Sequence, residues 1–124
     1  MTSLALFIIN SLKINIPMKN SFNVTLNEKI IYSYTDKPAP ARLRRFLDEI
    51  DNDMANGIQL GELFEETPSL IQKQQYVSMK LFDAIERKDN NLIELLSAYL
   101  MSRNPDIKHI TITESDDLFN LTLK

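Results

Sequence analysis

Residues 22–34 read FNVTLNEKIIYSY, a stretch in which apolar and polar side chains alternate on both sides of a short interruption. An alternation of period two is typical of a half-buried strand. The apolar positions are Phe22, Val24, Leu26, Ile30, Tyr32 and Tyr34. Asn27, in the interruption, tolerates the left-handed backbone that a tight turn needs. The stretch therefore predicts a β-hairpin.

A second hairpin is predicted at the other end of the sequence. Ile110 and Ile112 alternate with polar residues, and the same alternation returns after the polar segment 114–117. Its apolar positions there are Phe119, Leu121 and Leu123. The sequence therefore begins and ends its patterned region with strand pairs.

A first helix is predicted directly after the first hairpin, because apolar side chains recur there at spacings of three and four. It should begin near Pro40, a residue suited to a first helical turn, and end at Asn56-Gly57. Its apolar stripe is Leu43, Phe46, Leu47, Ile50 and Met54. The connector 58–66 carries enough apolar residues to pack against the rest of the domain.

Two more helices are predicted before the second hairpin. One should open at Thr67-Pro68 and run to about Arg87, with Leu70, Val77, Leu81 and Ile85 in its core stripe. The other should open with Asn91 as its cap and close at Arg103-Asn104-Pro105. Its apolar positions are Leu92, Leu95, Leu96, Tyr99 and Leu100.

These segments predict a single α+β domain over residues 1–124, with an antiparallel sheet of four to five strands and three helices packed on one face. The possible fifth strand is Leu12–Ile16, where the same alternation occurs. Residues 1–17 are either that extra strand or a loosely packed N-terminal extension. The apolar run Leu4–Ile9 follows no basic residue and is too short to span a bilayer.

Composition excludes several functional classes. The 124 residues contain no cysteine, so there is no thiol nucleophile or thiolate-held metal, and a reducing cytoplasmic location is expected. Two glycines, Gly57 and Gly61, cannot form a glycine-rich phosphate loop. The net charge of −3 argues against nucleic acid as the main partner. No cofactor, membrane contact or catalytic residue is predicted.

The charged residues are unevenly distributed along the chain. Residues 46–72 contain seven acidic and no basic side chains. The first helix carries Arg42, Arg44 and Arg45 at its N-terminal end and carboxylates toward its C-terminal end, which opposes the helix dipole at both ends. A basic partner would compensate for this cost. The predicted partner-binding residues are Asp48, Glu49, Asp51, Asp53, Glu62, Glu65 and Glu66.

The leading functional hypothesis is therefore a small non-enzymatic protein-binding module, such as a regulator, an adaptor or a phage- or toxin-type inhibitor. Its acidic surface would bind a protein partner with a basic surface. Electrostatic steering of this kind predicts slower association at higher ionic strength.

A second hypothesis is a divalent-metal-binding protein or metal-assisted hydrolase that uses Asp51, Asp53 and Glu62. The stretch 51–62 resembles the calcium loop of EF-hand proteins, with Asp at positions 1 and 3, an apolar residue at 8 and Glu at 12. It departs from that pattern at position 5, where Ala55 has no side-chain oxygen, and at position 6, where Asn56 replaces glycine. The resemblance implies a calcium site in this loop.

Three further hypotheses concern other surfaces. Nucleic acid could bind through Arg42, Arg44 and Arg45 together with the tyrosines of the first hairpin, although core packing of those tyrosines is favoured. His109, the only histidine, is expected on the polar face of the sheet, where it could transfer protons for a Ser or Thr nucleophile, although no spacing favours a particular one. Met79, with Tyr76, lies away from the deepest face of its helix and could support a homo-oligomer.

Overall fold

The structure, a computed structural model, describes residues 20–38, 41–116 and 118–124. The strand predicted at Leu12–Ile16 and the extension 1–17 lie outside these residues. In chain order the described elements are β1 (Ser21–Leu26), β2 (Lys29–Thr35), α2 (Leu43–Ala55), β3 (Ile58–Leu60), β4 (Leu63–Glu65), α3 (Leu70–Arg87), α4 (Asn90–Arg103), β5 (His109–Ser115) and β6 (Leu118–Leu123). The α+β class and both predicted hairpins are confirmed.

The main sheet has the strand order β2-β1-β5-β6 and is mixed, so the prediction of an antiparallel sheet is wrong at its centre. Each hairpin is antiparallel, but β1 and β5 pair in parallel, with Val24 opposite Ile110. The chain leaves β2 at Thr35, opposite the start of β1, and re-enters the sheet at His109 near that same end. A return at the same end makes β5 parallel to β1.

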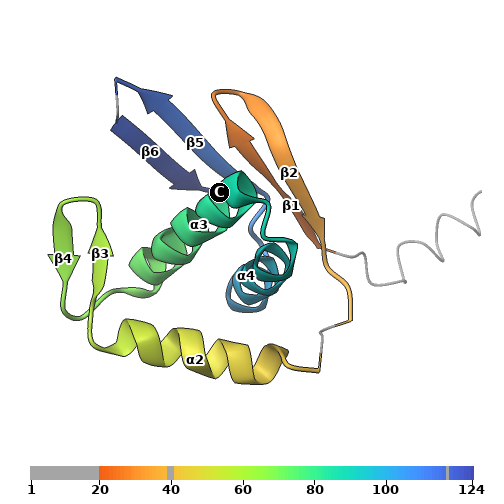
Figure 1. Ribbon diagram of the computed structural model, residues 1–124, viewed down its shortest axis with the longest axis vertical. Helices are drawn as coiled ribbons and strands as arrows, with labels where there is room; N and C mark the ends of the chain where they lie inside the picture. The colour runs from red at the N-terminus through yellow and green to blue at the C-terminus, as the bar shows by residue number, and fades with distance from the viewer. Residues whose placement is uncertain (1–19, 39–40, 117) are drawn as a thin grey trace, which may run out of the picture.

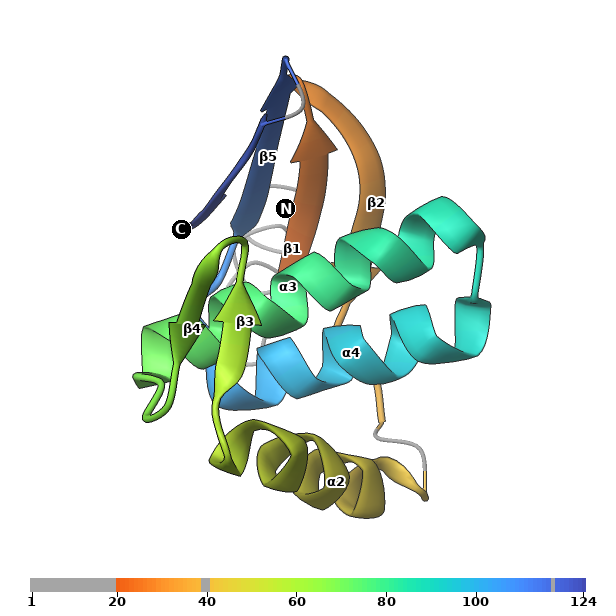
Figure 2. The ribbon, with the colours of Figure 1, turned by 60° about the vertical axis from the view of Figure 1, so that its left-hand side comes forward.

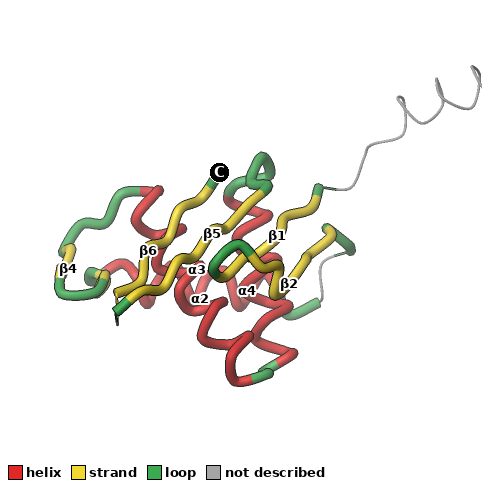
Figure 3. The backbone as a smooth tube through the Cα atoms, turned by 90° about the horizontal axis from the view of Figure 1, so that it is seen from above, coloured by secondary structure: helices red, strands yellow, loops and turns green. Residues whose placement is uncertain are grey.

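The helices form two layers under the sheet rather than one (Figures 1 and 3). α3 and α4 lie against one face of the sheet, and α2 packs on the far side of α4. The side chains of α4 show this sandwiching, because Ser97 bonds to Tyr32 of β2 and Tyr99 bonds to Asp51 of α2. Only part of the predicted one-face packing is therefore present.

The core lies between the sheet and the α3–α4 layer. Phe22 and Val24 of β1 and Ile110 and Ile112 of β5 are almost fully buried there, as the alternation predicts. Tyr34 is 4% exposed and its ring packs 5.5 Å from that of Phe22. The first-hairpin tyrosines therefore serve packing, as favoured above, and Tyr34 offers no open ring for stacking a base.

The three predicted helix starts are displaced by two or three residues, and α2 begins at Leu43 rather than near Pro40. The N-cap of α3 is Ser69, whose hydroxyl accepts from the backbone of Gln72 while Gln72 accepts from the backbone of Ser69. This reciprocal capping box satisfies two backbone donors, which Thr67-Pro68 would not do. The N-cap of α4 is Asp89, two residues before the predicted Asn91, because its carboxylate reaches the Leu92 N–H at 3.3 Å. The predicted helix ends at Arg87 and Arg103 are confirmed.

The connector after α2 forms the short hairpin β3–β4, which the sequence pattern did not predict (Figure 2). Its turn is Gly61-Glu62, with Gly61 at φ +60°. Ile58 is buried, as packing of the connector requires, but Leu63 and Phe64 are each 54% exposed. No helix in the described ranges is long and apolar enough to cross a membrane.

Candidate functional site

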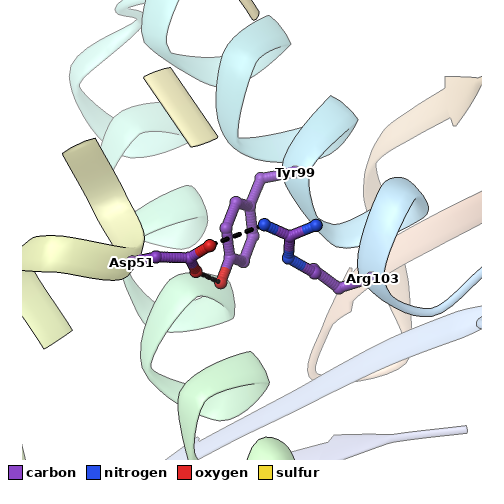
Figure 4. Close-up of polar contacts among 3 residues, drawn as sticks. All are labelled: Asp51, Tyr99 and Arg103. Carbon is purple, nitrogen blue, oxygen red and sulfur yellow. Dashed lines mark hydrogen bonds and ion pairs between the residues drawn. The ribbon is translucent and has the colours of Figure 1, made fainter. Parts of the chain in front are cut away.

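The carboxylate of Asp51 is partly exposed and is held by two residues of α4 (Figure 4). The Tyr99 hydroxyl donates to Asp51 Oδ1 at 2.7 Å, and Arg103 Nη2 donates to Oδ2 at 2.6 Å. The guanidinium also lies over the Tyr99 ring, 5.2 Å from its centroid. One member of the predicted acidic site is thus neutralised within the molecule.

The contacts shift the pKa values of all three groups. Burial alone would raise the pKa of Asp51, but the hydrogen bonds from Tyr99 and Arg103 and the charge of Arg103 outweigh it and lower the pKa. Burial, followed by the bond to Asp51, raises the pKa of Tyr99 to about 12. The pKa of Arg103 is raised chiefly by its hydrogen bond to Asp51. At neutral pH the cluster is a charged pair with a neutral phenol.

The other predicted acidic residues occupy two regions. Asp48, Glu49 and Asp53 are exposed on α2, and Asp53 lines a hollow with Lys80 and Arg87 of α3. Glu49 is paired with Arg45 at 3.3 Å, whereas no ion pair joins Arg44 to Asp48. The remaining three, Glu62, Glu65 and Glu66, lie on or beside the β3–β4 hairpin. Folding therefore divides a block that is continuous in the sequence.

The metal hypothesis gains no support from this arrangement. Within the ranges that the structure describes, no group of three or more His, Cys, Asp or Glu side chains is placed to hold a metal ion. Asp51, the first residue of the loop that resembles an EF-hand, already accepts hydrogen bonds on both oxygens. Residues 51–55 belong to α2, so the first positions of that loop are helical.

An apolar groove lies between α3 and β6. One hollow of about 300 Å³ lies under the sheet and is lined by Met79, Phe82, Asp83, Glu86, Ile112, Phe119 and Leu121. A second, of about 680 Å³, is lined by Leu60, Gly61, Glu62, Gln75, Met79, Leu118, Phe119 and Leu121. Met79, Phe119 and Leu121 line both hollows, so the two form one groove.

Large apolar side chains are exposed to solvent along this groove. Leu118 is 69% exposed, Phe119 52% and Met79 40%. The ring of Phe119 packs against that of Phe82, with the two centroids 5.8 Å apart. Contiguous exposed apolar surface rimmed by polar residues is typical of an interaction site. The volumes fall in the range of about 300–1,000 Å³ that is usual for binding pockets.

The charged side chains that line the groove are all acidic: Glu62, Asp83 and Glu86. Asp83 is also paired with Arg87 on the next helical turn at 2.9 Å. Glu62 and Glu86 form no ion pair with any residue that the structure describes. The groove therefore combines an apolar floor with a negative rim.

Sequence reasoning found only part of this site. It identified Glu62 and the outward-facing Met79, but Phe119 was assigned to a hairpin with no functional role. His109 is exposed on the polar face, as predicted, and Arg42, Arg44 and Arg45 are exposed at the start of α2. The signal available for the groove was the uncharged strand sequence LFNLTL at 118–123, which leaves apolar residues on both faces.

Comparison of the chain with protein-family models, with curated proteins and with solved structures found no match in any of the three.

Proposed function

We propose that this protein is a small protein-binding module that holds a partner segment in the groove between α3, β6 and the β3–β4 turn. The segment would present apolar anchor residues with Lys or Arg beside them. The observation that carries this proposal is an open apolar floor, including Phe119 and Met79, inside a rim that is only acidic.

The apolar floor supports a protein partner because partly exposed aromatic and methionine side chains are enriched at interfaces. Covering Phe119, Leu118 and Met79 would remove apolar surface from water, which is favourable by about 25 cal/mol per Å². The acidic rim selects the charge of the partner, since Glu62 and Glu86 would attract Lys or Arg and speed the encounter. The proposal keeps the basic partner and Glu62 from the sequence-based hypothesis but moves the site from the other acidic residues of α2 and the connector to the groove.

The test is a selection of dodecapeptides from a random display library against the full chain, followed by affinity measurements on the enriched peptides. We expect enriched sequences with apolar residues next to Lys or Arg, and affinity that falls as salt rises. The double variant Glu62→Lys with Glu86→Lys should weaken binding at least about tenfold, or about 1.4 kcal/mol.

The matched control is Asp48→Lys with Glu49→Lys, which makes the same change in net charge on α2 at two exposed residues that do not line the groove. It should bind the peptides like the unmodified chain. If the α2 double variant loses binding and the groove variant keeps it, the site is on α2 and the proposal is wrong. A selection that enriches nothing would also overturn it.

A further inference from the structure

β6 is an edge strand with one open side. It pairs only with β5 among the described strands. The His109 and Lys124 backbones exchange hydrogen bonds in both directions at 2.9 Å, which fixes the alternation of the ladder. From that pair, the backbone groups of Asn120 and Thr122 point to β5, and those of Phe119, Leu121 and Leu123 point away from the sheet. The same phase appears in β5, where the Ile112 carbonyl points away from β6 and accepts from the Asn27 N–H, directly after β1.

The two edges of the sheet differ in their protection. The opposite edge strand, β2, begins with Lys29 and its pairing with β1 shifts register between Val24 and Thr25. A charged residue and a bulge are ordinary protections against an added strand. β6 pairs with β5 in unbroken register over Leu118–Leu123 and contains no charged residue, proline or glycine. It is therefore the edge open to pairing.

The groove runs along this open edge. Leu118 and Phe119 are neighbours in a strand, so their side chains point to opposite faces, yet both line the 680 Å³ hollow. Gly61 and Glu62 of the β3–β4 turn line its other side. The hollow thus lies beside the outward backbone groups of β6, between that strand and the hairpin turn.

Resting on the proposed function, we infer that the partner segment binds in extended form and adds a strand to the free edge of β6. Alternate side chains of the segment then point under the sheet toward Met79 and Phe82, where the 300 Å³ hollow lies. Basic residues at the flanks meet Glu62 and Glu86. Main-chain hydrogen bonds supply affinity and the apolar hollow selects the side chains, as in other cases of strand addition.

A second copy of this chain is a poorer occupant than a basic segment. Pairing of β6 with β6 of another copy would place the two acidic rims, each with Glu62, Asp83 and Glu86, beside the same short interface. Like charges placed together across an interface cost free energy. Charge complementarity therefore favours a partner of opposite sign.

The experiment uses the most enriched dodecapeptide of the selection above, as a synthetic peptide, with the isotope-labelled full chain. Amide hydrogen exchange is followed by NMR with and without saturating peptide. The N–H groups of Phe119, Leu121 and Leu123 should exchange at least about tenfold more slowly, which corresponds to about one hydrogen bond each. Those of Asn120 and Thr122 already bond to β5 and should change less.

Two series of variants separate backbone pairing from side-chain contact. Leu121→Pro and Leu121→Ala both remove the leucine side chain, but only the proline removes the outward N–H. The proline variant should bind the peptide at least about threefold more weakly than the alanine variant. This factor corresponds to about 0.7 kcal/mol, the loss expected for one hydrogen-bond donor. N-methylation of the peptide gives a test that does not depend on how the proline variant folds. In an added strand, every second peptide N–H points to β6 and the others point away. Methylation of the first set should abolish binding, and methylation of the other set should be tolerated.

The outcomes distinguish this inference from the function on which it rests. If the peptide binds in the groove but the three outward amides keep their exchange rates, or N-methylation is tolerated in both phases, strand addition is wrong and the binding module stands. If no peptide is selected, both fail. If the chain alone sediments as a dimer with those amides protected, the occupant of the edge is a second copy and the inference is wrong.

Discussion

The phenol of Tyr99 donates a hydrogen bond to Asp51 Oδ1 at 2.7 Å and so joins α4 to α2. Arg103, one helical turn further along α4, binds the other oxygen of the same carboxylate. The outer helix of the molecule is therefore held to the central helix by a charged cluster as well as by apolar contacts. The contacts of Asp51 therefore join two helices, a role in the stability of the fold.

Replacement of Asp51 by Asn should make stability less dependent on pH at acid values. The pKa of the Asp51 carboxyl is lowered by folding from its ordinary value of 3.8. A lowered pKa gives a contribution that is present above the unfolded value and is lost as pH falls through the folded value. Urea unfolding at pH 7 should show the Asn variant less stable by about 1 kcal/mol, discounted because both charged groups are partly exposed.

As pH falls through the lowered folded pKa of Asp51, the difference between Asp51→Asn and the unmodified chain should shrink toward zero, since the carboxyl then becomes protonated in both states. Asp48→Asn is the matched control, because Asp48 is exposed on the same helix and forms no ion pair with a described residue. Its effect at pH 7 should stay within about 0.5 kcal/mol. A difference for Asp51→Asn that is constant over this pH range would contradict the assignment.

Removal of the Arg103 side chain should cost more than removal of an arginine on the surface. Arg103→Ala leaves Asp51 partly buried with one donor and removes the stacking over Tyr99. We expect a loss of about 1–2 kcal/mol in the free energy of unfolding. Arg45→Ala breaks only an exposed pair with Glu49 and should cost at most about 0.5 kcal/mol. If Arg103→Ala and Arg45→Ala lower the free energy of unfolding equally, the cluster of Asp51, Tyr99 and Arg103 stabilises the protein no more than an exposed ion pair does.

The two glycines should respond differently to substitution by alanine. Gly57 has φ +111°, and a Cβ there would come within 2.6 Å of the Phe64 ring and 2.8 Å of the Glu65 carbonyl oxygen. Gly57→Ala should therefore destabilise the protein by about 2–3 kcal/mol and displace the β3–β4 hairpin. Gly61 has φ +60° with open space around it, so Gly61→Ala should cost about 1 kcal/mol.

Thermal or urea unfolding gives the stability of both glycine variants, and binding of the selected peptides reports the position of the hairpin turn. Gly57→Ala should weaken that binding, because the turn at Gly61 and Glu62 forms one wall of the groove. If Gly61→Ala is the more destabilising change, the close approach at Gly57 is not what holds the hairpin.

The sequence predicted those parts of the fold that a single segment reveals by itself. A helical stripe or a strand alternation indicates which face of one segment is buried. The predicted residues Leu43, Ile50 and Met54 of α2 and Phe22 and Val24 of β1 are all buried. The relative direction of β1 and β5 depends on how the chain returns through three helices, and periodicity within a strand does not contain that information. The three-residue strands β3 and β4 are likewise too short to show an alternation.

The candidate site was harder to predict for a related reason. Counting acids along the chain places Asp51 and Glu62 together, but the helical position of Asp51 turns it toward Tyr99 of α4. The groove joins Met79 of α3 to Phe119 of β6, residues 40 positions apart, and no local pattern connects them. Glycine at the first turn position of 60–63 was the usable signal for the missed hairpin, because such a turn typically has Gly there.

Two buried serines provide the last prediction. Ser78 is 1% exposed on α3, and its hydroxyl has no hydrogen-bond partner among the described residues, whereas the equally buried Ser97 on α4 donates to the Tyr32 hydroxyl at 3.3 Å. Burying an unpaired hydroxyl costs about 1–3 kcal/mol, so Ser78→Ala should leave stability unchanged or raise it by up to about 1 kcal/mol. Ser97→Ala removes the hydrogen-bond partner of the part-buried Tyr32 hydroxyl and should lower the stability of the protein.

Both serines lie inside helices, so the gain in helix propensity is common to both variants and cancels when their stabilities are compared. We expect the two variants to differ by about 1–2 kcal/mol in urea unfolding. A Ser78→Ala variant that is less stable than Ser97→Ala would mean that the Ser78 hydroxyl has a partner in solution.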